Sequence, residues 1–178
     1  MKLRNVFIEA AAWCFLPLAV YYKFGIDVLT LVLLPCAVVT PHLVFIDIRK
    51  KILPNKFIYP AIFATLLIIT CFAISQGSFA KFTQPVSRAV IISGLAFILY
   101  VISRGKIGAG DVKLFFLTGL VLGVFSPEHL IMSQLITSVA VLIFTVTLLA
   151  LKRVTVKTRI AFGPFILLGT WLTVFLFN

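Results

Sequence analysis

Long apolar runs separated by short polar stretches dominate the pattern of this chain. The runs do not alternate apolar and polar residues with a period of two, so strands of a transmembrane β-barrel are not indicated. A helix that crosses a bilayer needs about 20 mostly apolar residues. We therefore predict an all-α, polytopic transmembrane helix bundle, with a six-helix core and an extra N-terminal helix. The predicted apolar segments are 6–22, 28–46, 57–74, 89–103, 112–126, 130–151 and 160–177.

Two of these segments, 89–103 and 112–126, are short for full spans. We interpret them as helices that end at a polar pocket below the membrane surface. The stretch from Ser75 to Ser87 is interpreted as the longest outside loop, because its Gly77 and Pro85 are typical of turns. The predicted organisation is an N-terminal transmembrane helix with its outside turn over residues 1–27, followed by a membrane core over residues 28–178.

Composition supports a membrane protein and argues against a nucleic-acid partner. Hydrophobic residues make up 62% of the chain, charged residues 12%, and the mean hydropathy is +1.18. A soluble domain carries about 25% charged residues. The formal net charge of +11 could suggest nucleic acid. However, the basic residues cluster in short loops between apolar runs, as orientation signals do. We therefore expect membrane lipids, and no nucleic acid, as neighbours of these loops.

The positions of the basic residues predict the orientation of the chain. If the N-terminus is cytoplasmic, thirteen of the sixteen Lys and Arg residues fall on the cytoplasmic side, leaving Lys23, Lys81 and Arg88 outside. The positive-inside rule favours this arrangement. It predicts a multi-pass protein of the inner (cytoplasmic) membrane with its C-terminus outside. It also places Asp47 and Asp111 at the same, cytoplasmic, edge.

Asp111 is a candidate functional residue because an ionisable group near hydrocarbon is costly to keep. It follows Gly108-Ala109-Gly110, where glycines permit a sharp turn and the close approach of another segment. At the start of a helix, its carboxylate would be favoured by backbone N–H groups and by the helix dipole. Taken alone, the motif is also compatible with an ordinary N-cap after a glycine turn.

Asp47 ends another apolar run and begins the stretch Asp47-Ile48-Arg49-Lys50-Lys51-Ile52-Leu53-Pro54-Asn55. Pro54 disfavours helix at Leu53, and Asn55 is predicted to cap the next helix with its side chain. Taken alone, Asp47 is also compatible with a simple ion pair to Arg49 or to a lysine at the membrane interface.

The two aspartates together suggest acid–base chemistry. Two carboxylates within hydrogen-bond reach (about 2.6–3.2 Å) of one water can activate it as a nucleophile. One accepts a proton from the water, while its partner, kept protonated, polarises a substrate carbonyl; such a pair shares a proton. This chemistry needs no cofactor or metal, and none is predicted. Candidate residues that shape the site or lie near substrate are Pro54, Asn55, Gly108, Gly110, Lys113, Gly163 and Pro164.

The motif around Asp47, the segment Gly108-x-Gly110-Asp111-Val112-Lys113 and the run Ala161-Phe162-Gly163-Pro164-Phe165 occur in this order. In this the chain resembles the type IV prepilin peptidases, which are membrane aspartic peptidases of the GxGD group, over about residues 28–177. The resemblance implies that Asp47 and Asp111 are catalytic. It further implies that a prepilin or pilin-like substrate loses its short basic leader at the cytoplasmic face. The long members carry a cytoplasmic insert with paired C-x-x-C motifs and also methylate the new pilin terminus. This chain has no such insert, so it resembles the compact, peptidase-only form, and no methyltransferase activity is expected.

Two other classes of function remain open at this stage. A proton-coupled transporter would use membrane carboxylates as a relay, and a non-catalytic membrane scaffold would use both aspartates only to cap helices or pair with cations. The sequence leaves open which pilin is the substrate, the oligomeric state, and whether the site closes on substrate binding.

Overall fold

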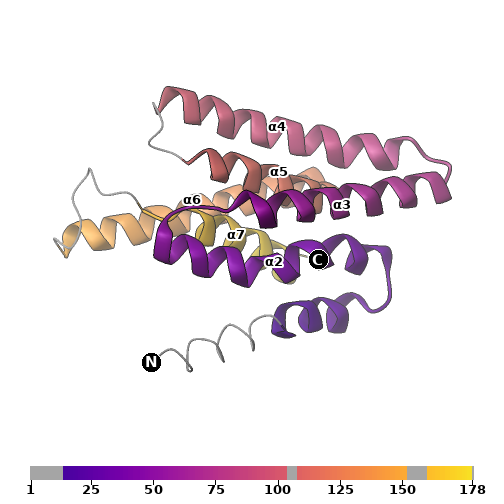
Figure 1. The fold of residues 1–178 in the computed structure, drawn as a ribbon, viewed down its shortest axis with the longest axis horizontal. Coiled ribbons are helices and arrows are strands. Elements are labelled where there is room, and N and C mark those ends of the chain that lie inside the picture. Colours follow the sequence, from indigo (N-terminus) through magenta and orange to yellow (C-terminus); the bar gives the residue numbers. More distant parts are fainter. Residues whose placement is uncertain (1–13, 104–107, 152–159, 178) are drawn as a thin grey trace.

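A computed structural model of the chain describes residues 14–103, 108–151 and 160–177 (Figure 1). Over these residues all regular secondary structure is α-helical, which confirms the predicted helix bundle. The described part of the chain contains seven helices. They are Cys14–Phe24, α2 (Val28–Lys50), α3 (Asn55–Ser75), α4 (Ala80–Ile102), α5 (Ala109–Gly123), α6 (Pro127–Ala150) and α7 (Gly163–Leu176).

Four of the described helices, α2, α3, α4 and α6, are long and apolar enough to cross a membrane. Helix α5 has only 15 residues. At about 1.5 Å per residue it is roughly 22 Å long, which is less than the hydrocarbon core of about 30 Å. The prediction that the fifth segment is short is therefore confirmed.

The prediction for the fourth segment was wrong. Helix α4 begins at Ala80 and has 23 residues, so most of the stretch predicted as an outside loop is helical. Its first two turns carry exposed polar residues, which an apolar pattern cannot detect. Pro85 lies inside the helix, where it is buried, while the turn expected at Gly77 is present, with φ of +56°. A proline inside a helix removes one helical hydrogen bond. Here Pro85 is also buried against α5.

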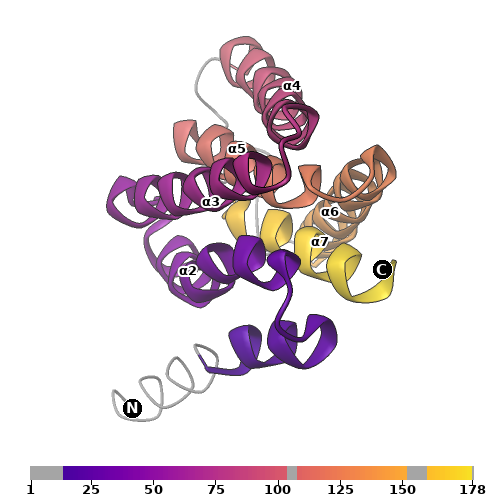
Figure 2. The same ribbon diagram turned by 90° about the vertical axis from the view of Figure 1, so that its right-hand side faces the viewer.

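Helix α5 lies at the centre of the bundle. It packs against α2, α3, α4, α6 and α7, and Figure 2 shows it between α4 on one side and α3, α7 and α6 on the others. Ten of its 15 residues are buried, and several of them belong to the main hydrophobic core. Because other helices surround it, α5 can be shorter than the bilayer without exposing its ends to lipid.

Helix α4 is joined to α5 most closely at the end far from Asp111. A Cβ atom added at Gly119 would lie 2.8 Å from Cα of Ala89, and one added at Gly123 would lie 2.8 Å from Cα of Pro85. At the same end, Nη1 of Arg88 donates hydrogen bonds of 2.7 Å to the carbonyl oxygens of Gly123 and Phe125. The backbones of α4 and α5 therefore touch here, with no side chain between them.

The N-terminal helix Cys14–Phe24 is fastened to α7. Nζ of Lys23 donates to the carbonyl oxygens of Val174 (2.9 Å) and Phe175 (2.8 Å), at the C-terminal end of α7. The last carbonyls of a helix have no partner within the helix and carry a partial negative charge, so an ammonium group is favourable there. Val20 is fully buried in the same core as residues of α2 and α7.

Candidate active site

Asp47 lies in the last turn of α2, where the helix ends in a tight turn. Lys51 adopts the left-handed conformation (φ 53°, ψ 37°), and its N–H donates to the carbonyl oxygen of Asp47 at 2.8 Å. Pro54 then precedes α3 with extended backbone (φ −74°, ψ 127°), and Leu53 lies outside both helices, as predicted. The turn directs Leu53 into the core, where only 8% of it is exposed.

The carboxylate of Asp47 is held by the beginning of α7. Asp47 is 4% exposed, and its Oδ2 accepts a hydrogen bond of 2.9 Å from the backbone N–H of Gly163, the first residue of α7. The C-terminal end of α2 disfavours a negative charge, whereas the N-terminal end of α7 favours one. Arg49, a candidate ion-pair partner, lies over the ring of Phe45 at 3.7 Å. The Asp47 carboxylate is therefore bound by the N-terminus of α7.

Asp111 is the third residue of α5, so it lies at the start of a helix as predicted, while the N-cap itself is Gly108. Its Oδ2 accepts a hydrogen bond of 3.1 Å from the N–H of Gly108, and its own N–H donates to the carbonyl oxygen of Gly108 at 3.0 Å. An acid at the third position of a helix commonly reaches back in this way. With 8% exposure, Asp111 is buried. Each aspartate thus accepts an N–H group at the start of a helix.

Leu53 connects the three motifs. A Cβ atom added at Gly110 would lie 2.7 Å from Cβ of Leu53, so the close approach expected at this glycine is present. A Cβ added at Gly163 would lie 3.3 Å from Cδ2 of Leu53 and 2.8 Å from Oδ2 of Asp47. Gly108 has φ of −77°, which any residue can adopt, so its backbone does not need glycine for a turn. At Gly110 and Gly163, lack of space explains the missing side chain.

A cavity of about 440 Å³ contains both aspartates in its wall. Figure 1 shows that α2 ends, and α5 and α7 begin, at the same end of the bundle. The structure therefore brings Asp47 and Asp111, 64 positions apart in sequence, to one cavity. Most of the other wall residues are apolar, among them Ile52, Leu53, Leu99, Phe115 and Phe162.

The other predicted site residues divide into two groups. Gly108 and Gly110 line the cavity, and Gly163 contacts Asp47 from the start of α7. Pro54, Asn55, Lys113 and Pro164 do not line it. Pro164 is the second residue of α7, where the missing N–H of proline costs little.

The predicted cap by Asn55 was wrong. Asn55 is the first residue of α3, behind the N-cap Pro54, and its Oδ1 accepts a hydrogen bond of 2.8 Å from Nζ of Lys113. The ammonium group of Lys113 also lies 5.0 Å from the ring centre of Tyr59. Side chains two positions apart on a helix, such as those of Asp111 and Lys113, differ in direction by roughly 200°. Lys113 therefore points away from the side of α5 that carries Asp111, and it joins α5 to α3.

Sequence reasoning missed the wall that α6 contributes. Gln134, Thr137 and Ser138 line the cavity. Their spacing places them on one side of a helix, and polar groups in a membrane helix generally face the protein interior. That spacing within an apolar helix was the signal that could have identified them. Thr137 also supports the fold, since its Oγ1 donates to the carbonyl oxygen of Phe165 at 3.3 Å.

Comparison with protein families identifies a match. Residues 34–146 match the family model described as the type IV leader peptidase family. The matched stretch is more than half of the 178-residue chain and includes Asp47 and Asp111, whereas Gly163 lies beyond it. No curated protein and no solved structure matches the chain.

Proposed function

Since the chain belongs to the type IV leader peptidase family, we propose that it is a membrane aspartic endopeptidase in which Asp47 and Asp111 activate one water molecule. The observation that carries this proposal is that both buried carboxylates line the same cavity. Each has one oxygen fixed by a backbone N–H, at distances of 2.9 and 3.1 Å. Fixed carboxylates in a largely apolar wall are suited to hold a water and a peptide bond in a defined orientation.

The reaction needs one proton shared by the two aspartates, because two negative charges close together in weakly polar surroundings are costly. The ionised carboxylate removes a proton from the water, whose oxygen bonds to the peptide carbonyl carbon. The protonated carboxyl gives its proton to the carbonyl oxygen, so the tetrahedral intermediate is neutral. When the C–N bond breaks, the nitrogen takes a proton from one carboxyl while the other removes a proton from a hydroxyl of the intermediate. The pair ends as it began, with one proton.

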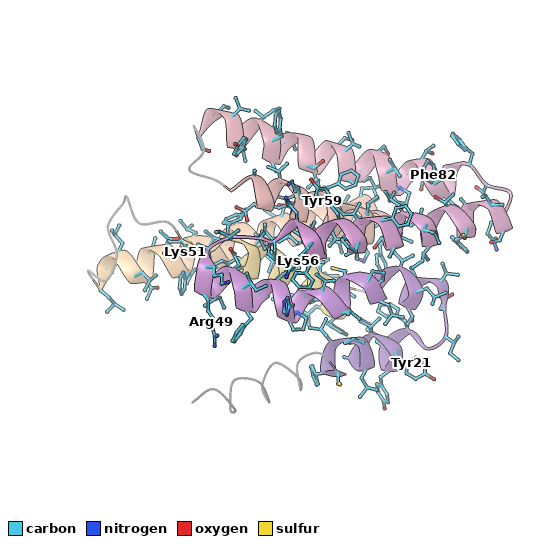
Figure 3. All side chains as sticks on the ribbon, in the orientation of Figure 1. Tyr21, Arg49, Lys51, Lys56, Tyr59 and Phe82 are labelled. Carbon is cyan, nitrogen blue, oxygen red and sulfur yellow. The ribbon has the colours of Figure 1, made fainter. Side chains whose placement is uncertain are left out.

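The proposed substrate is a prepilin-like protein whose short basic leader precedes an apolar segment. Arg49 and Lys51 lie at the end of the bundle where α2 finishes (Figure 3), which the positive-inside rule assigns to the cytoplasm. The ionised member of the acid pair suits a basic leader, although Lys51 lines the same cavity, and the other basic residues at this end of the bundle suit anionic lipid headgroups. We therefore place cleavage at the cytoplasmic face of the inner membrane.

Two helices with largely exposed surfaces, α4 and α6, contribute to the cavity wall, which suggests how a membrane-bound substrate reaches it. Ala96 and Leu99 of α4 and Gln134 and Ser138 of α6 belong to its wall. Helix α4 packs on α5 and α3, whereas α6 packs on α7 and α5. We propose that the apolar segment of the substrate remains in the bilayer beside α4 and α6, while the adjoining peptide enters the cavity between them.

Single replacements of Asp47 and Asp111 by asparagine test the proposal, because asparagine keeps the shape and removes the ionisable group. Leader removal from a co-expressed prepilin is followed by the change in its mass. Each variant is expected to lose cleavage by at least about 10²-fold, the usual contribution of a general acid or base. The matched control is Asp27→Asn. Asp27 caps α2 by accepting from the N–H of Val28 at 2.7 Å, and asparagine caps equally well. Wild-type cleavage by either Asp47→Asn or Asp111→Asn would refute the mechanism.

A further inference from the structure

Helix α6 carries polar side chains into a cavity whose catalytic role is assigned above to other helices. Gln134 is half-buried and Ser138, one turn later, is exposed; both line the cavity with Thr137 between them. Helix α6 is otherwise apolar enough to cross a membrane. A glutamine in such a helix is costly unless it has a polar partner, so its position in the cavity wall needs an explanation.

The partners of these side chains within the protein differ. Thr137 is 1% exposed, donates to Phe165, and packs where a Cβ on Gly169 would collide with it, so its role is explained by the packing of α6 on α7. Gln134 makes no hydrogen bond to any residue that the structure describes. Because Gln134 lines the cavity, its amide, with two donors and one acceptor, borders the cavity without a hydrogen-bond partner among the described residues.

We infer that Gln134, assisted by Ser138, binds the backbone of the substrate next to the cleaved bond and so positions that bond for the two aspartates. This inference rests on the proposed peptidase function. A peptide that enters the cavity exchanges water for walls formed largely by Ile52, Leu53, Leu99 and other apolar residues. Its N–H and C=O groups then require partners, since an unpaired buried backbone group is costly.

A side-chain amide suits this task better than a charged group does. It can accept from one peptide N–H and donate to a C=O, whatever side chains the substrate carries. The hydroxyl of Ser138 offers one more donor a single turn away. Gln134 is thus a positioning residue that acts on the substrate backbone, whereas the proton transfers belong to Asp47 and Asp111.

Gln134→Leu tests the inference, because leucine has a similar size and no hydrogen-bonding group. The matched control is Gln84→Leu, since Gln84 is exposed in the first turns of α4 and lies outside the cavity. Cleavage is measured with purified full-length protein on a synthetic prepilin segment. It is repeated on a series in which single amide bonds flanking the cleaved bond are replaced by esters, each of which removes one N–H donor.

With the all-amide substrate, kcat/KM of Gln134→Leu is expected to fall roughly 10- to 100-fold, mainly through KM, in line with the loss of a buried hydrogen-bond partner. One ester substrate should lack the N–H that Gln134 binds. On that substrate kcat/KM of the wild type should already be low, and Gln134→Leu should lower it by less than about twofold more. Gln84→Leu should match the wild type throughout. Thermal unfolding of both variants is measured alongside.

The inference is overturned if Gln134→Leu stays within twofold of wild type, as Gln84→Leu does, while Asp47→Asn is inactive. It is equally overturned if Gln134→Leu loses the same factor on every substrate of the series, because that pattern indicates a general structural effect. Cleavage by Asp47→Asn would instead defeat the proposed function itself, so the two failures are distinguishable.

Discussion

The carboxylate of Asp47 accepts a hydrogen bond of 2.9 Å from the backbone N–H of Gly163, a residue 116 positions later in the chain. This contact places the end of α2 against the beginning of α7, and it orients one oxygen of a buried acid. It also explains the absence of a side chain at residue 163, where a Cβ atom would come within 2.8 Å of that oxygen.

Gly163→Ala is expected to reduce leader cleavage by about 10²-fold, because a displacement of roughly 1 Å at a reacting group costs about that much. The added methyl group pushes the Asp47 carboxylate away from its N–H partner. Steady-state cleavage of a prepilin segment measures the effect. Gly94→Ala is the matched control, since a Cβ at Gly94 meets no atom within 4 Å. Equal activity of the two variants would contradict the packing described here.

Lys113→Met is expected to leave cleavage within about twofold of wild type. The Lys113 ammonium group donates an exposed hydrogen bond to Asn55 of α3 and does not line the cavity. An exposed hydrogen bond of this kind contributes on the order of 1 kcal/mol to the free energy of unfolding. Unfolding in detergent and cleavage are both measured. A loss of activity comparable to that of Asp111→Asn would show that Lys113 belongs to the site after all.

Gly119→Ala is expected to lower the free energy of unfolding by about 1–3 kcal/mol, the usual cost of overpacking. The new Cβ would lie 2.8 Å from Cα of Ala89, and backbone cannot move aside as a flexible side chain can. Thermal unfolding in detergent reports the change. By comparison, Gly94→Ala is expected to be neutral or to stabilise α4 by up to about 1 kcal/mol. The prediction fails if both alanines have the same effect.

Lys23→Met is expected to destabilise the protein by roughly 1–3 kcal/mol, because two carbonyl groups at the end of α7 lose their half-buried donor. Lys81→Met is its control, since the Lys81 ammonium group makes one exposed hydrogen bond of 3.2 Å to Gln76. Unfolding temperatures of the two variants are compared. A larger effect at Lys81 would contradict the anchoring role of Lys23.

The sequence predicted the helical bundle and the two aspartates because large free energies underlie both. Helices satisfy the backbone in lipid, so long apolar runs leave little choice of secondary structure. Burying an acid is costly enough that Asp47 and Asp111, among only five acids, were conspicuous. That both line one cavity agrees with this reasoning, while their catalytic roles remain a proposal.

Features that depend on smaller energies or on tertiary contacts could not be predicted. The first turns of α4 are polar and become helical beside α5, with Arg88 bound to the carbonyl groups of Gly123 and Phe125. The side chain of Asn55 binds Lys113 and does not cap α3. Either role gives Asn55 about one hydrogen bond, so the two differ little in free energy and the sequence alone does not decide between them. The contact between Asp47 and Gly163 depends on the packing of helices that local patterns do not specify.

The link between Asp47 and the start of α7 also bears on biosynthesis. A newly made chain cannot complete this site until Gly163 has left the ribosome and α7 has inserted beside α2. Until then the Asp47 side chain lacks the N–H group that fixes its orientation. Proteolytic competence is therefore expected to arise only once α7 has entered the bilayer beside α2.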